Sequence, residues 1–360
     1  MKANFKNLSL INVVLLFSLI GIGCFSNQTT DPNQLVKGNP VTNSVVNDEI
    51  HSYTVPLEKD QYLVLKIEQN DVDVIAEVFA PNGESLGEFD TPTSGRGTET
   101  VRIGAANTGD YKINIFTLSD NAEPGTYSLE LADNRNLTDT DRKILSAVKF
   151  HQEADKLRAE AETRVESIPL YEKALEIWRE TGEKADEGNT LRAMGFAYQR
   201  MDDLEKAKEH FGKALEIWEE IGDHRSAAFA NVIFGVIAKK QNDLETGLQQ
   251  DIKAQPLWIK AGDLPEATQN LVRIAGDYKK LGKKDESLAY YKQALEASKN
   301  IEKKSVKAYV YSSYGDALAE YGNKTEALEF YKQSLKLWKT LEHEKVVKNL
   351  QEKIDKLSVS

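Results

Sequence analysis

A repeat with a period of 40 residues constrains the fold of this chain more than any other feature of its sequence. Between about residues 148 and 340, a small residue recurs at this spacing, at Ala174, Ala214, Ala254, Ala294 and Ser334. All four tryptophans of the chain lie four residues beyond such a position, at Trp178, Trp218, Trp258 and Trp338. Self-similarity at a fixed period indicates a repeat architecture, in which each unit buries its apolar face against its neighbours.

Within each unit, the spacing of small and aromatic residues predicts two helices. The first helix carries a small residue at Gly195, Gly235, Ala275 and Gly315, which allows the second helix to pack closely. The second helix carries an aromatic ring at Tyr171, Phe211, Tyr291 and Tyr331. Capping boxes are expected to open second helices at Asp202-x-x-Glu205, Asn242-x-x-Glu245 and Asn323-x-x-Glu326. Glycine C-caps are expected at Gly182, Gly222 and Gly262.

This pattern resembles the tetratricopeptide repeat, and the second unit carries the resemblance best, with Gly195, Tyr198, Ala207, Phe211 and Ala214. The 40-residue spacing is similar to the longer-helix variant of kinesin light chains and bacterial signalling proteins. The resemblance implies a superhelix of five helix pairs over residues 140–340, and residues 341–360 are expected to form a capping helix and tail.

Two units depart from the pattern. The first has Asp155 where a small residue is expected, with an insertion expected before its second helix. In the third, Asp251 replaces the aromatic ring and Pro256 lies within the second helix, where proline removes a hydrogen bond. Either this unit is a degenerate repeat that bends the superhelix, or the break forms a pocket or hinge for a partner.

Residues 47–135 have short runs of alternating polar and apolar residues, separated by turn signals such as Pro81-Asn82-Gly83. The region carries 17 acidic and 6 basic side chains, a balance of −11. We therefore expect a separate, acidic, antiparallel β sandwich. Gly109-Asp110-Tyr111 and Gly125-Thr126-Tyr127 resemble strand starts of the jelly-roll-like pre-peptidase C-terminal domains of bacterial secreted proteins.

A metal site is not expected in this domain. Asp71, Asp73, Glu84 and Asp90 have the oxygen ligands that calcium prefers, but their spacing matches no defined calcium loop. A solvated acidic face is the better interpretation, and a spacer or adhesion role follows from it.

The N-terminus has the layout of a secretory signal over residues 1–24, with lysines before an apolar run. Ile20-Gly21-Ile22-Gly23-Cys24 resembles a bacterial lipoprotein signal, although Gly21 stands where that family usually has Leu. This resemblance implies lipidation of Cys24 and an extracytoplasmic, membrane-anchored protein. A cleaved, secreted chain and an uncleaved anchor remain the alternatives. Residues 25–46 are polar and are expected to be a spacer.

The tetratricopeptide resemblance implies that the first helices line a concave groove that binds a protein or peptide. The residues mapped to this groove are Asn189, Arg192, Phe196, Gln199, Phe229, Val232, Val236, Lys239, Gln269, Arg273, Lys279, Tyr309 and Ser312. Its cations and aromatic residues would suit a peptide with acidic and apolar side chains, unless these positions are merely solvated helix ends. Phe196 replaces the Asn of the chaperone-type carboxylate clamp, so that clamp is not expected. A further hypothesis is that the acidic β domain folds back on the groove as an internal competitor.

No catalytic motif emerges from the sequence. The five histidines have no metal-ligand spacing, and Val347 stands where a zinc-protease helix beginning at His343-Glu344 needs its second histidine. A net charge of −11 argues against nucleic-acid binding. We therefore expect a non-enzymatic interaction scaffold, without cofactor, metal or small-molecule ligand. The alternatives are a regulatory or substrate-recruiting subunit of a peptidase or envelope-assembly complex, and ligand or glycan binding by the β domain.

Overall fold

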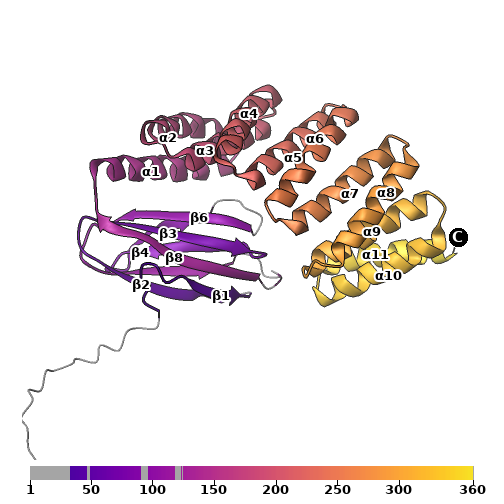
Figure 1. Ribbon diagram of the computed structural model, residues 1–360, viewed down its shortest axis with the longest axis horizontal. Coiled ribbons are helices and arrows are strands. Elements are labelled where there is room, and N and C mark those ends of the chain that lie inside the picture. Colours follow the sequence, from indigo (N-terminus) through magenta and orange to yellow (C-terminus); the bar gives the residue numbers. More distant parts are fainter. Residues whose placement is uncertain (1–32, 47–48, 91–95, 118–122, 124, 360) are drawn as a thin grey trace, which may run out of the picture.

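The computed structural model describes residues 33–359, apart from 47–48, 91–95, 118–122 and 124. Within this range, an N-terminal pair of antiparallel sheets is followed by an all-helical repeat region, as the sequence predicts (Figure 1). The proposed signal and Cys24 lie outside the described residues. The helices follow one another in a curved row, and the sheets lie on the inner side of the curve.

The strands form two four-stranded antiparallel sheets with the orders β1-β8-β3-β6 and β2-β7-β4-β5. Along β3, Leu63, Leu65 and Ile67 are buried whereas Lys66 and Glu68 are exposed, so alternation with period two places one face in the core. The strands are β1 (Val41–Val45), β2 (His51–Leu57), β3 (Gln61–Asn70), β4 (Ile75–Phe79), β5 (Ser85–Phe89), β6 (Arg96–Gly104), β7 (Gly109–Phe116) and β8 (Gly125–Asn136).

The expected spacer over residues 25–46 is wrong at its C-terminal end. Strand β1 pairs with β8 in full register from Val41 to Val45, and Leu35 is buried in the core of the sandwich. The three residues between Val41 and Val45 are exposed, which gives this edge strand a polar composition. Its two apolar ends nevertheless supply enough burial to fix it to the sheet.

The helical region contains eleven α-helices and one short 3₁₀ helix among the described residues. They are α1 (Asp139–Ala159), η1 (Arg164–Glu166), α2 (Ser167–Thr181), α3 (Lys184–Arg200), α4 (Leu204–Ile221), α5 (His224–Lys240), α6 (Leu244–Lys260), α7 (Leu264–Lys280), α8 (Lys284–Ser298), α9 (Lys304–Glu320), α10 (Lys324–Thr340) and α11 (Glu344–Val359). The first ten form consecutive antiparallel pairs, and η1 lies in the expected insertion between α1 and α2.

Close approach within a pair depends on the recurrent small residue, as predicted. A Cβ atom added to Gly195 would lie 2.9 Å from the ring of Phe211, and one added to Gly315 would lie 2.9 Å from the ring of Tyr331. In the first pair, Asp155 occupies the equivalent position and accepts a hydrogen bond from the hydroxyl of Tyr171. A polar contact thus replaces the close apolar one.

The expected capping boxes at Asp202 and Asn242 do not form, and the N-cap of each helix lies one residue later. Asp202 and Asn242 adopt left-handed backbone conformations, with φ of 62° and 64°. The caps are instead Asp203 and Asp243, whose side chains accept from the amides of Lys206 and Thr246. At the third site, Asn323 is the N-cap residue but its side chain makes no capping bond. The predicted glycine C-caps are confirmed at Gly182 and Gly222, which have left-handed backbone conformations. Gly262 is also left-handed, but it lies one residue beyond the C-cap of α6.

Pro256 lies within α6, which remains one continuous helix from Leu244 to Lys260. Of the helices in the described ranges, none has both the length and the apolar character that crossing a membrane requires.

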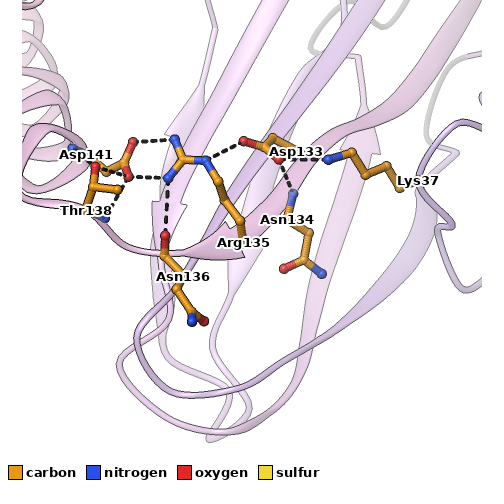
Figure 2. Close-up of polar contacts among 7 residues, drawn as sticks. All are labelled: Lys37, Asp133, Asn134, Arg135, Asn136, Thr138 and Asp141. Atoms are coloured by element: carbon orange, nitrogen blue, oxygen red, sulfur yellow. Dashed lines mark hydrogen bonds and ion pairs between the residues drawn. The ribbon is translucent and has the colours of Figure 1, made fainter.

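The two regions meet at a short, tightly bonded joint after β8 (Figure 2). Arg135 donates to both carboxylate oxygens of Asp141, at 2.5 and 2.8 Å, and its Nε donates to Asp133 at 2.8 Å. Asp141 also completes a capping box with Thr138 at the start of α1. These hydrogen bonds hold the pKa of Asp141 well below its ordinary value. The direction in which α1 leaves the sandwich is therefore fixed by charge-assisted hydrogen bonds.

Apolar contacts reinforce the joint. Val148 of α1 packs against the core of the sandwich. A Cβ atom at Gly104, the last residue of β6, would lie 2.9 Å from Leu145 of α1. The first helix is thus packed on the sandwich, and it sets where the remaining helices lie.

Candidate protein-binding surface

The residues predicted to line the groove lie on the odd-numbered helices α3, α5, α7 and α9. These helices contact one another in sequence along the row. The rings of Phe196 in α3 and Phe229 in α5 lie 6.0 Å apart, Lys239 of α5 pairs with Asp277 of α7 at 2.5 Å, and Lys279 of α7 pairs with Glu320 of α9 at 2.8 Å. The predicted residues therefore belong to one continuous inner layer.

An aromatic and cationic group joins the first two of these helices. The guanidinium of Arg192 lies 6.0 Å from the ring centroid of Phe229, and Phe196 packs edge to face on Phe211 at 5.1 Å. Arg192 is only 8% exposed. Burial lowers the pKa of Arg192, and the charge of Glu99 on strand β6 opposes this change. Arg192 is thus enclosed between the array and the sandwich, whereas Asn189 and Gln199 on the same helix are half-buried.

The cations on α5 and α7 belong to a buried ionic network in the third repeat. Lys239 lies 2.5 Å from carboxylate oxygens of both Asp251 and Asp277, which are 1% and 4% exposed. Arg273 approaches Asp251 at 3.7 Å and donates to the side chain of Asn270 at 2.9 Å. Burial raises the pKa of Asp251, although Lys239 and Arg273 act in the opposite direction. Asp251, which stands where other repeats have an aromatic ring, is therefore the acceptor of a charge network.

The structure thus gives each of the four predicted groove cations an interaction within the chain. Arg192 is enclosed beside Glu99, Lys239 and Arg273 share Asp251, and Lys279 pairs with Glu320. Binding of an acidic peptide by these cations would first have to break those interactions. Breaking the interactions of Lys239 and Arg273 with the buried Asp251 would be costly, whereas the pair of Lys279 with the exposed Glu320 contributes little. Binding of an acidic peptide by these cations stays a prediction.

Apolar side chains remain accessible on the same layer. Val236 is 44% exposed and Tyr309 is 39% exposed, which are high values for such side chains. Phe229, Val232 and Gln269 are half-buried. Gln269 donates to Glu266 on its own helix, and Ser312 donates to the carbonyl of Tyr309. The two most exposed of the predicted groove residues are therefore apolar or aromatic.

The sandwich contributes contacts to this layer that the sequence interpretation missed. Arg102 of β6 reaches Glu183 at 3.0 Å and Asp186 at 2.9 Å, both at the start of α3. Arg96 of the same strand lies 3.9 Å from Asp263, the N-cap of α7. Figure 1 shows β6 as the strand beside α1 and α3. The fold-back hypothesis thus agrees with the arrangement, but the acidic domain makes much of this contact through arginines.

The four candidate calcium ligands do not form a shared site in the part of the chain that is described. Asp71 accepts two hydrogen bonds from Arg96, at 2.9 and 2.7 Å. Burial raises the pKa of Asp90, and the charge of Asp73 raises it further. Glu84 accepts from Asn82 in its own turn. Within these ranges, no three acidic, His or Cys side chains are placed so that they could hold a metal ion.

An antiparallel β sandwich joined to stacked helix pairs defines a helical-repeat protein with an appended β domain. Residues 157–220, 186–257 and 266–340 match the sequence model of the tetratricopeptide repeat. The helical region is therefore an array of tetratricopeptide repeats, as its 40-residue period and its small and aromatic positions predict. Such repeats are typically non-catalytic interaction scaffolds.

Solved structures of similar fold include BtubC (BKLC) from P. vanneervenii, with 14% identity, 57% of this chain and 93% of that chain covered, and a TM-score of 0.40. Aspartyl phosphate phosphatase F from Bacillus subtilis is 15% identical, and the match covers 62% of this chain and 61% of that chain with a TM-score of 0.43. PilF from Pseudomonas aeruginosa is 16% identical, and the match covers 59% of this chain and 93% of that chain with a TM-score of 0.39. No curated protein matches the sequence.

Proposed function

We propose that this protein is a non-enzymatic scaffold that binds a protein or peptide partner on the inner layer of its repeat array. The observation that carries the proposal is the exposure of Val236 on α5 and Tyr309 on α9, which are 44% and 39% exposed. The sequence predicts a partner with acidic and apolar side chains. Because the cations of this layer are already paired, apolar side chains of the partner would supply most of the affinity.

Two exposed positions elsewhere provide a matched control. Ile259 on α6 is 56% exposed and Val165 on η1 is 63% exposed. The test compares a V236D/Y309A variant with an I259D/V165A variant of the same chain. Affinity capture from native membranes, followed by mass spectrometry, identifies proteins retained by the unmodified chain. The affinity of each such protein is then measured for both variants.

The inner-layer variant is expected to bind about 10- to 100-fold more weakly for each buried apolar contact that it loses, since one such side chain contributes about 1.5–3 kcal/mol. The control variant is expected to bind like the unmodified chain. If a captured partner binds both variants equally well, the inner layer is not its binding surface. Circular dichroism of both variants excludes loss of folding as the cause.

We also propose that the protein works outside the cytoplasm, anchored to a membrane by lipid on Cys24. The layout of residues 1–24, with lysines, an apolar run and a single cysteine at its end, supports this location. Mass spectrometry of the N-terminal peptide tests it directly. A C24S variant should leave the membrane fraction unless the apolar run itself stays in the membrane as an uncleaved anchor.

A further inference from the structure

The N-cap positions of the inner helices α3, α5, α7 and α9 recur every 40 residues, and two of these four positions are not aspartate. Asp223 caps α5 and Asp263 caps α7, each by accepting a hydrogen bond from a backbone amide three residues later. The equivalent residues are Glu183 before α3 and Lys303 before α9, and neither side chain makes a capping bond. Two inner helices therefore lack the cap that their neighbours have.

At α9, the sandwich supplies the missing cap. The carboxylate of Glu123, between β7 and β8, accepts hydrogen bonds from the backbone amides of Lys304 at 2.6 Å and Ser305 at 2.8 Å. The first turn of α9 contains no acidic residue of its own. Since the first amides of a helix have no intrahelical partner and carry partial positive charge, a carboxylate there is favourable. Glu123 thus does from another domain what Asp223 does within α5.

At α3, the replaced cap residue is used differently. Glu183 turns to Arg102 of β6, which also pairs with Asp186 and is only 13% exposed. Burial would lower the pKa of Arg102, but the charges of Asp186 and Glu183 outweigh it and the pKa is raised. The pairing therefore favours the charged form of Arg102. Both N-cap positions that are not aspartate thus lie at a contact with the sandwich, and the unchanged Asp263 also lies 3.9 Å from Arg96.

The contacts far from the joint are polar, whereas those at the joint are also apolar. Val148 and Leu145 of α1 pack on the sandwich next to the Arg135–Asp141 pair. By contrast, the contact with α7 is the 3.9 Å ion pair of Arg96 with Asp263, and the contact with α9 consists of the hydrogen bonds of Glu123. The hydrogen bond of Glu123 to Lys304 is exposed and is therefore open to screening by salt, whereas the pair of Arg96 with the buried Asp263 is screened less. Each repeat contacts only its neighbours, so the array can change its curvature. The distant contacts can therefore open while α1 stays attached.

We propose that the β sandwich is a built-in, dissociable occupant of the inner side of the array, held there by Arg102 and Glu123. In the closed state it encloses Arg192 and ties α9 to the sandwich. A partner of the inner layer binds the open state better, because closure restricts both the access to this layer and its curvature. This second step rests on the proposed function, whereas docking itself does not.

The test uses the full chain with the substitutions R96Q, R102Q and E123Q. A control with K66Q, K112Q and E130Q on strands β3, β7 and β8 changes the charge of the sandwich equally. Hydrogen exchange is followed at the amides of Lys304 and Ser305, and the radius of gyration is measured by small-angle scattering. We expect exchange at these amides to be about tenfold faster or more in the triple variant, with an increased radius, since charge-assisted hydrogen bonds protect them. The control should resemble the unmodified chain, and high salt should shift that chain towards the variant.

Adding K303D to the triple variant separates capping from docking. This substitution places an aspartate at the position of Asp223 and Asp263, which accept from the amide three residues later, so it should slow exchange at the amide of Val306 without restoring the radius of gyration. If the triple variant has the same exchange rates and the same radius as the unmodified chain, the sandwich is not held by these residues and the proposal is wrong.

The effect on binding is measured with a partner identified on the unmodified chain. Tighter binding to the triple variant than to the control supports competition by the sandwich. Equal affinity, despite faster exchange and an increased radius, overturns competition and leaves the binding function intact. If no partner binds any variant, the proposed function fails and competition fails with it, while exchange and scattering alone decide whether the sandwich docks.

Discussion

Replacement of Gly195 by alanine tests how the helix pairs are held together. An added Cβ atom would lie 2.9 Å from two atoms of the Phe211 ring, well inside the usual carbon–carbon contact distance of about 3.5–4.0 Å. Phe211 is fully buried and Phe196 packs edge to face on it at 5.1 Å, so the ring has little room to move. Overpacking of this kind costs about 1–3 kcal/mol. The higher helix propensity of alanine returns about 1 kcal/mol.

Gly212 on α4 provides the matched control. No atom outside the local helix lies within 4 Å of the Cβ position there. G212A should therefore stabilise the protein by about 1 kcal/mol, while G195A should destabilise it by about the same amount. Because both substitutions gain the same helix propensity, the difference between them isolates the contact with Phe211.

Urea unfolding followed by circular dichroism measures this difference in free energy. A G195A/F211L double variant should recover part of the loss specific to G195A, since the smaller side chain leaves room for the added methyl group. If G195A stabilises the protein as much as G212A does, close approach of the helices does not explain the recurrent small residue.

Three further predictions concern charges. The D251A variant should have a free energy of unfolding about 3–5 kcal/mol lower in urea titrations, because Lys239 would lose one of its two buried carboxylate partners and Arg273 would lose its carboxylate partner. The D141N variant should be less stable than the unmodified protein at neutral pH and should lose less stability on acidification. The pKa of Asp141 is lowered in the folded state, so its contribution is present above the ordinary value of about 3.9 and is lost as pH falls through the folded pKa. An R135K variant should weaken the joint and raise the apparent pKa of Asp141 in NMR titrations, because lysine cannot reproduce both hydrogen bonds.

The repeat architecture could be predicted because its determinants are local and recur. Gly195 and Phe211 lie 16 positions apart within one unit, and the same pair returns as Gly315 and Tyr331. Strand β1 could not be recognised, since its exposed central residues give it the composition of a linker. The displaced caps had another cause. Asp202 precedes Asp203, and only the left-handed conformation of the first residue shows which of the two is the cap.

The groove cations were harder to interpret because their partners come from other helices. Lys239 interacts with Asp251 on α6 and Asp277 on α7. Neither aspartate occupies an equivalent position to Lys239 in the 40-residue repeat, so aligning the repeats does not pair them. In sequence, a cation on an inner helix is indistinguishable from one that awaits an acidic ligand. Asp251 was recognised as a departure from the repeat, but its role required the structure. A charged residue in an aromatic column is therefore a reason to expect buried ion pairs nearby.

The N-cap column shows that a repeat alignment also contains information about domain docking. A cap residue that changes in one repeat leaves the first amides of that helix without a partner, which costs about 1 kcal/mol unless another group replaces it. Lys303 is such a change, and Glu123 of the sandwich is the replacing group. Glu183 is a second change, and Arg102 is its partner. Glu123 replaces a missing cap, whereas Arg102 pairs with the side chain that stands in the cap position, and both residues come from the sandwich. The sequence of the array thus changes at two positions that meet this domain, and under the competition proposed above a partner of the inner layer would have to displace these contacts.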